Sequence, residues 1–346
     1  MGRRGLRLTQ RHLNRAVLAR QELLEPFDGP LPRVLERVGG IQAQYAPSMY
    51  VGLWSRMRGL ERSALTRALE DRTVVQGTLL RSTIHLVSRE DYWPFAVAIR
   101  ESLREWFLRV SKGNPAATEL DAAAKRVRSA LADGPLRQAE IDALVGRSAR
   151  GGINTVLDLV RIPPSGTWER RKADLHADAE SWIGPPDVAT SEARALVVRR
   201  YLGGFGPATT AEIGNWAGLP ARTVTEALTR IDHVTHEADD GATLVDLPGA
   251  PLPDAGTPAP IRFLPTWDAV LLVHARRARI LPEEHRPKVF SSRNPHSVPT
   301  FLVDGAVAGS WRFVDGRIDL TEFDSLPRGV RRQVERAAHD LAAFHA

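Results

Sequence analysis

Apolar residues recur at helical spacing in some segments and alternate with polar residues in others, and the two patterns follow a repeating order. The order is clearest between residues 191 and 250. The elements predicted there are helices over 193–202, 211–217 and from 222, and strands over 233–237 and 242–247. Thr210 precedes the second helix as an N-cap, and Asp240-Gly241 joins the strands as a tight turn. A helix-turn-helix followed by a hairpin is a winged-helix motif.

Two looser copies of this order lie upstream. The second copy has predicted helices over about 120–131, 136–144 and 152–159, followed by a hairpin-like segment over 162–172. The first copy has predicted helices from the Thr9 cap to Glu22, over 31–38 and near 62–69, followed by strands over 74–79 and 82–87. Ser88 then caps another helix, and Asp91 stands at the reciprocal position of a capping box.

The segment after Gly249 differs in character from these copies. It is proline-rich as far as Pro260, and it then has a strand-rich pattern with a hairpin over 301–311 that turns at Asp304-Gly305. An amphipathic helix is predicted over about 328–344. We therefore predict an α+β, mostly α fold with three tandem winged-helix motifs and a strand-rich C-terminal segment. The predicted units are 1–115, 116–190, 191–250 and 251–346.

Composition narrows the class of protein. No apolar run in the 346 residues approaches the roughly 20 that a membrane span needs. The chain has no cysteine, and its ten histidines show no metal-ligand spacing, so we expect no disulfide, metal or cofactor. A net charge of +6 and a pI near 10.1 favour an anionic partner. These features predict a cytoplasmic, nucleoid-associated protein that needs no obligate protein partner.

Several basic and aromatic residues are candidate DNA contacts. Arg222 begins a helix, where a side chain and the helix N-terminus can bind one phosphate together. Arg170, Arg171 and Lys172 end the second hairpin-like segment, which either enters a DNA groove or is a solvated turn. Trp168 adjoins them and is the tryptophan that best suits stacking on a base, although aromatic residues in apolar surroundings usually belong to the core.

Gln42 and Gln44 form the most informative pair in the chain. They follow Gly39-Gly40, which ends the 31–38 helix as a C-cap. In an extended segment both amides point to one side and Ala43 points away. Such amides can orient a water or a sugar-phosphate group, but they cannot act as a general base near neutral pH. The alternative is that they satisfy backbone groups at a turn.

Five segments of the sequence, one of which contains this pair, resemble the bacterial AlkZ-like winged-helix DNA glycosylase family. The matching segments are Gly40–Gln44 with 50–56, Leu80–Val87, 161–168, 264–272 and 310–312. They span nearly the whole chain, and their combination is specific although each alone is weak. The resemblance implies that Gln42 and Gln44 are the catalytic pair, in a family with either Gln-x-Gln or Gln-x-acid there. Arg81 and His85, in the second segment, become candidate DNA contacts.

The resemblance also implies a function. It implies a concave DNA-binding channel and the excision of N7-alkylated purines from double-stranded DNA, including bulky genotoxin adducts and interstrand crosslinks. N7-alkylation places a positive charge on the purine, so the base departs as a neutral molecule and a positioned water captures the sugar cation. No lysine stands near the glutamine pair, which favours a monofunctional glycosylase that leaves an abasic site.

Alternatives remain open at this stage. Asp91 or Asp268 can be considered as a carboxylate that stabilises the sugar cation, and His85 as a satisfied histidine beside a core strand. A non-enzymatic winged-helix regulator explains the charge and the helices, but it leaves the glutamine pair unexplained. A drug-sequestering resistance protein is a third hypothesis. Release of a base from alkylated DNA distinguishes a glycosylase from a regulator and from a drug-sequestering protein.

Overall fold

The computed structural model describes residues 6–271, 277–290 and 297–346, which form a mixed α/β fold. Leu272, the last residue of one motif noted above, lies outside these ranges. In the parts of the chain that are described, no helix combines the length and the apolar character that crossing a membrane requires.

Residues 190–246 follow the predicted order of three helices and a hairpin. The elements are α9 (Thr190–Phe205), α10 (Thr210–Ala217), α11 (Ala221–Leu228), β8 (Val234–Ala238) and β9 (Thr243–Asp246). Gly241, with a φ of 80°, makes the predicted turn. The predicted cap of α10 is wrong by one residue. Thr209 is the N-cap, because its hydroxyl accepts from the Glu212 backbone N–H at 3.2 Å and the Glu212 carboxylate accepts from the Thr209 N–H at 2.7 Å.

The first two predicted units share one six-stranded sheet. Its strands, in spatial order, are β2 (Ile41–Gln42), β4 (Ile84–Ser88), β3 (Val74–Thr78), β6 (Leu159–Arg161), β7 (Leu175–Asp178) and β5 (Leu136–Arg137). The sheet crosses the predicted boundary at 115/116, since β3 pairs with β6 and Gly77 lies opposite Val160. A second sheet joins β1 (Arg7–Leu8), which sequence patterns did not reveal, to β8 in parallel. The predicted ranges thus describe order along the chain, while sheets run across them.

Among the described residues, the first two predicted units contain eight α-helices. They are α1 (Gln10–Arg20), α2 (Leu31–Val38), α3 (Ala46–Trp54), α4 (Arg62–Glu70), α5 (Arg89–Val110), α6 (Ala117–Leu131), α7 (Gln138–Val145) and α8 (Ala179–Ile183). The helix predicted over 152–159 is wrong: only Ile153–Thr155 forms a 3-10 turn, and Leu159 already belongs to β6. Pairing with β3 satisfies this backbone and overrides the local pattern. The segment 162–172 belongs to the loop that joins the paired antiparallel strands β6 and β7.

The C-terminal segment is strand-rich, as predicted. Its antiparallel sheet contains β10 (Arg262–Leu264), β11 (Thr300–Val303), β12 (Ala306–Val314) and β13 (Arg317–Glu322), and its helices are α12 (Arg286–Val289) and α13 (Arg328–His345). Asp304 and Gly305, with φ of 47° and 80°, make the predicted turn. Sequence patterns did not reveal β13. Phe344, near the end of α13, packs against Trp54 of α3 with ring centroids 5.9 Å apart.

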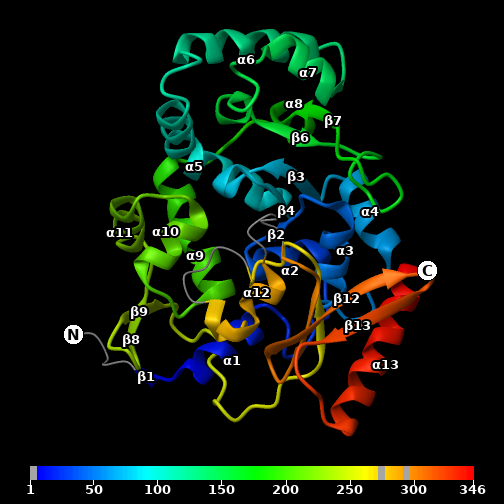
Figure 1. Cartoon of the computed structure of the whole chain (residues 1–346). Coiled ribbons are helices and arrows are strands. Elements are labelled where there is room, and N and C mark those ends of the chain that lie inside the picture. The colour runs from blue at the N-terminus through cyan, green and yellow to red at the C-terminus, as the bar shows by residue number, and fades with distance from the viewer. Residues whose placement is uncertain (1–5, 272–276, 291–296) are drawn as a thin grey trace.

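The elements surround β2 and α2 (Figure 1). In that view α6 and α7 lie at the top, α9 to α11 on the left, and α13 on the lower right. The long helix α5 packs on α9, and an ion pair joins them: Arg200 donates to both carboxylate oxygens of Asp91, each at 2.8 Å. Ser88 caps α5 as predicted, accepting from the Asp91 N–H at 3.2 Å. The Asp91 carboxylate, however, does not close the predicted capping box, because it binds Arg200.

Candidate active site

Gln42 ends a short edge strand that two glycines set in place, and Gln44 follows it by two residues. Gly39 and Gly40 have φ of 79° and 80°, in the left-handed region that favours glycine. A Cβ at Gly40 would also lie 2.9 Å from Val87 Cγ1, so the chain enters β2 directly against β4. In the register, Ile41 faces Leu86 and Gln42 faces His85. Gly39 and Gly40 therefore indicate both the end of α2 and the close approach of β2 to β4.

The two amides lie on one side of this strand, as predicted. The Gln42 side-chain Nε2 donates to the Gln44 Oε1, whereas Ala43 between them is 2% exposed. Gln42 is 5% exposed and Gln44 is exposed. Among the described residues neither amide has another side-chain hydrogen bond. The pair therefore keeps the Gln42 carbonyl and the Gln44 N–H donors available for a water or a sugar, oriented by the bond between the two side chains.

His85 lies opposite Gln42 in the β2–β4 pairing, as a neutral imidazole. Burial, and to a smaller extent the charge of Arg81, lowers the pKa of His85 to about 3. Its Nδ1 lies 3.0 Å from the Thr83 carbonyl oxygen, a distance at which a neutral Nδ1–H donates. At 3% exposure the side chain is buried beside the strand. It cannot supply a proton near neutral pH, and its surroundings match the alternative of a satisfied core histidine.

Arg81 brings a positive charge to the same side through a strained turn. Arg81 and Ser82 have φ of 56° and 59°, a conformation that residues other than glycine rarely adopt, and such strain often marks functional segments. The Arg81 guanidinium donates to the Trp216 carbonyl at the end of α10. Burial lowers its pKa to about 10, so the group stays charged near neutral pH. The turn thus links α10 to the strand that supports the glutamine pair.

The basic segment 170–172 lies beside the pair through the residue that follows it. Arg171 Nη1 donates to the Tyr45 hydroxyl at 3.4 Å, and Tyr45 follows Gln44 in the chain. Ser165 shapes this loop: its hydroxyl donates to the Lys172 carbonyl at 2.7 Å and accepts from the Asp174 N–H at 2.7 Å. Arg170 is exposed, and Lys172 forms a 3.0 Å ion pair with Asp174. Sequence reasoning missed Tyr45, although its position next to the motif was a usable signal.

Trp168 does not form an exposed stacking platform, contrary to the expectation from the sequence. It is 8% exposed, and its ring meets Tyr50, Phe344 and His345 at centroid distances of 5.5, 5.8 and 5.2 Å. The Arg62 and Arg171 guanidinium groups lie 4.9 and 5.6 Å from its ring centroid. An apolar ring surrounded by partners contributes to packing, so Trp168 ties the 162–174 loop to α3 and α13.

Arg222 is a predicted contact that the structure places apart from the glutamine pair. It lies in the first turn of α11, where its side chain is 90% exposed and its Nε donates to Glu226 Oε1 at 2.8 Å. In Figure 1, α11 and β2 are separated by α9 and α10. Any contribution of Arg222 is therefore to a wider surface and not to the chemistry at Gln42 and Gln44.

The two candidate carboxylates are both occupied. Asp268, 4% exposed, accepts from two nitrogens of Arg56 at 2.9 Å each, and Asp91, 2% exposed, is bound by Arg200. Burial raises the pKa of Asp91, and its pairing with Arg200 opposes that shift. Neither carboxylate is free to stabilise a sugar cation, because each compensates the charge of an arginine. The arginine partners were not apparent from the sequence.

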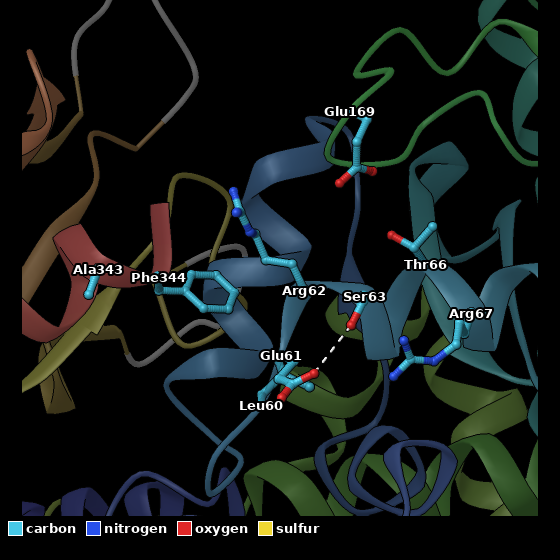
Figure 2. Close-up of a pocket in the computed structure, with 9 residues that line it drawn as sticks. All are labelled: Leu60, Glu61, Arg62, Ser63, Thr66, Arg67, Glu169, Ala343 and Phe344. Carbon is cyan, nitrogen blue, oxygen red and sulfur yellow. Dashed lines mark hydrogen bonds between the residues drawn. The ribbon is translucent and has the colours of Figure 1, made fainter. Parts of the chain in front are cut away.

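Cavities near the site differ in composition. The pocket in Figure 2, of about 530 Å³, is lined by the first turn of α4, Glu169 and the end of α13. Glu61, Glu169, Arg62 and Arg67 all line it, so its charge is mixed, and none of the predicted site residues lines it. Another pocket, of about 370 Å³, includes Tyr45 and Arg171. Among the described residues, no group of three or more histidine, aspartate or glutamate side chains is placed to hold a metal ion.

The chain is similar to known proteins in both sequence and fold. The sequence matches the family described as "DNA glycosylase AlkZ-like" over residues 35–344. It is 25% identical to an interstrand DNA cross-link repair glycosylase of Streptomyces sahachiroi, with 93% of each chain covered. The solved structure of the DNA glycosylase AlkZ of Streptomyces sahachiroi has the same fold, with a TM-score of 0.79 and 21% identity over 98% of this chain and 97% of that one. The chain belongs to the AlkZ-like DNA glycosylase family, and it is accordingly a DNA repair glycosylase, a hydrolase of N-glycosyl bonds.

Proposed function

We propose that this protein hydrolyses the bond between C1′ and N9 of N7-alkylated purines in double-stranded DNA, with Gln42 and Gln44 as the catalytic pair. The observation that carries the proposal is the amide pair itself: one side chain on an edge strand and one just after it, bonded to each other and with hydrogen-bonding groups to spare. Similarity to an interstrand cross-link repair glycosylase extends the proposal to bulky adducts and crosslinks.

The chemistry follows from the charge of the lesion. As the C1′–N9 bond breaks, its electron pair moves to the alkylated base, which leaves as a neutral molecule. A water oxygen then bonds to C1′ and loses its proton to solvent. The amides orient this water and place carbonyl dipoles near the sugar cation, and both effects favour the transition state over the ground state. An undamaged purine departs only with help from a strong acid, which this site does not supply.

The surroundings of the pair match this selectivity. His85 remains neutral near pH 7, and Asp91 and Asp268 are bound to arginines, so no proton donor stands behind the amides. Arg81 is positively charged, as the sugar cation is, so it cannot stabilise that cation. We assign it to a phosphate that flanks the lesion. Lys172, the lysine of the basic segment beside the pair, forms an ion pair with Asp174 at 3.0 Å, and we also propose a monofunctional enzyme whose product is an intact strand with an abasic site.

The DNA-binding surface is proposed to be a concave channel formed by three winged-helix motifs. Support comes from the order α9, α10, α11, β8, β9, and from exposed Arg170, Arg171 and Arg222. Because these groups meet phosphates rather than base edges, binding is expected to be nearly independent of sequence. Such an enzyme acts at the nucleoid.

The decisive experiment is single-turnover release of 7-methylguanine from duplex DNA. Gln42→Ala and Gln44→Ala should each slow release by about 10- to 1000-fold, the range for a lost positioning or dipole contact. Gln333→Ala, at an exposed position of α13, is the matched control and should keep the wild-type rate. Borohydride should trap no covalent complex. Wild-type rates in both alanine variants, with folding confirmed by melting, would mean that the two amides only satisfy backbone groups at a turn.

A further inference from the structure

We propose that the pocket beside Tyr45 binds the neutral aromatic part of a bulky N7 adduct while the glutamine pair holds the sugar. This inference rests on the proposed function and deepens it, since it assigns a place to the part of the lesion that lies beyond the base. We call this cavity, of about 370 Å³, the Tyr45 pocket. Its volume lies in the range of pockets that bind small organic molecules.

Aromatic rings from four separate segments line the Tyr45 pocket. Tyr45 comes from the start of α3, Trp168 from the 162–174 loop, Trp311 and Phe313 from β12, and His345 from the end of α13. Phe313 stacks on His345 at 4.5 Å with an interplanar angle of 22°, yet Phe313 and Tyr45 remain 40% and 44% exposed. Exposed rings that face a shared cavity favour a flat apolar ligand, which would remove them from water.

One buried polar group in this pocket lacks a partner. Ser48 lines the pocket and is 3% exposed, and within the described residues its hydroxyl makes no hydrogen bond. A buried hydroxyl without a partner costs free energy, so such groups call for an explanation. An occupant with an amide, ester or ether oxygen would supply the missing bond. The ligand class is therefore a flat ring that carries one polar group.

The charge of the residues that line the pocket favours the neutral arm of the adduct over the alkylated base as its occupant. Arg171 and Arg312 line the pocket, and no aspartate or glutamate among the described residues does. An N7-alkylated purine carries a positive charge, which two arginines without a compensating carboxylate disfavour. A neutral aromatic arm has no such conflict, and its ring face attracts a guanidinium group. The pocket therefore suits the arm and not the cationic base.

The position of the pocket agrees with the chemistry of the lesion. Tyr45 follows Gln44, about 3.8 Å along the Cα trace, and its extended backbone (φ −128°, ψ 118°) turns its side chain away from that of Gln44. In a purine, N7 belongs to the same five-membered ring as N9. An arm on N7 thus begins beside the bond that breaks and passes Tyr45 to enter the pocket, whereas a methyl group is too short to do so.

The test compares two lesions in one duplex sequence: N7-benzylguanine, which has an aromatic arm, and N7-methylguanine, which has none. Single-turnover release is measured at sub-saturating enzyme, and the ratio of the benzyl rate to the methyl rate is the readout. Phe313→Ala removes an exposed ring of the pocket, and Val314→Trp fills it. Each should lower the ratio about 10-fold, the loss expected for one aromatic contact. Trp106→Ala, an exposed aromatic residue of α5 outside the pocket, should leave the ratio unchanged.

The outcomes separate this inference from the proposed function. If the wild type releases neither base, the proposed function fails. If it releases both and the two pocket variants keep the wild-type ratio, the pocket inference alone is overturned. Benzamide, a ring with an amide, provides a measurement on the wild type that does not depend on variant folding. It should slow release of N7-benzylguanine more than release of N7-methylguanine, and equal slowing would also overturn the inference.

Discussion

The glutamine pair and the buried ion pairs show two ways in which this protein places polar groups inside its fold. Arg56 and Asp268 lie at the centre, each 2% exposed at the side chain, and two hydrogen bonds join them. Gln42 is as deeply buried, but its partner Gln44 is exposed and both are uncharged. In the first case every charge is compensated within the protein, and in the second hydrogen-bonding capacity is left for a ligand.

The difference indicates which groups hold the fold and which act on substrate. A buried charge whose partner is removed costs several kcal/mol, so an ion pair such as Arg56–Asp268 is fixed by stability. An amide at an edge strand contributes little to stability and is free to be selected for chemistry. The two candidate carboxylates were attractive in the sequence because their type suits glycosidic chemistry, but burial and pairing assign them to structure.

The largest expected effect is a loss of stability when a buried ion pair is broken. Asp268→Ala leaves the Arg56 guanidinium buried without its counter-charge, and we expect a loss of about 3–5 kcal/mol in the free energy of unfolding. Glu226→Ala breaks the exposed Arg222–Glu226 pair and should leave that free energy nearly unchanged. Chemical denaturation measures both. A loss below about 1 kcal/mol for Asp268→Ala would show that the two classes of polar group are not distinct in stability.

The catalytic role of the glutamine pair is tested by Gln44→Glu, which introduces the acidic residue that the family also has at this position. A carboxylate can still orient water and stabilises the sugar cation more strongly, so release of 7-methylguanine should stay within about 10-fold of the wild-type rate. The same variant should alter the preference among lesions. Single-turnover rates on two or more N7 adducts measure this, and a loss as large as that of Gln44→Ala would mean that the amide N–H donors are essential.

A third effect concerns the basic loop beside Tyr45. Replacing Arg170, Arg171 and Lys172 with alanine should weaken DNA binding about 10-fold at physiological salt and reduce the salt slope by about 2, since each phosphate contact contributes roughly 0.9 to it. The reduction falls short of three contacts because Lys172 already binds Asp174. Fluorescence anisotropy at several salt concentrations, on two unrelated duplexes, gives the slope. An unchanged slope removes this loop from the DNA-contact surface.

Local signals in the sequence predicted the parts of the fold that local chemistry determines. The Gly39 cap, the Asp240-Gly241 and Asp304-Gly305 turns and the shared side of Gln42 and Gln44 were all predicted and are all confirmed, because each depends on neighbours in the chain. The 152–159 helix was wrong because β6 pairs with β3, some 80 residues earlier in the chain. Local periodicity does not report such long-range pairing.

The candidate site was only partly predictable for the same reason. Trp168 and Asp91 carry the residue types expected of a DNA enzyme, but their partners Phe344 and Arg200 stand more than 100 residues away in the sequence. A single sequence without its contacts does not show that these side chains are already engaged. Tyr45 and Arg171, which the structure brings together, likewise come from separate segments.

The smallest expected effect is the absence of a pH response in catalysis, set against a clear one in stability. Burial lowers the pKa of His85 to about 3 and that of His176 to about 4, from an ordinary value near 6.5. Below pH 6.5 the unfolded chain takes up protons that the folded chain does not, so stability should fall with decreasing pH, by up to about 1.4 kcal/mol per pH unit for each histidine. The stabilisation is complete above pH 6.5.

Because the imidazole of His85 is neutral throughout, the single-turnover rate of the folded enzyme should change less than about 2-fold between pH 5.5 and 8. Denaturation curves and rates on the same preparation test both halves, and His85→Gln should flatten the stability slope. A rate that follows an apparent pKa near 6.5 would show instead that a histidine transfers a proton in the reaction, and the amide pair would then not act alone.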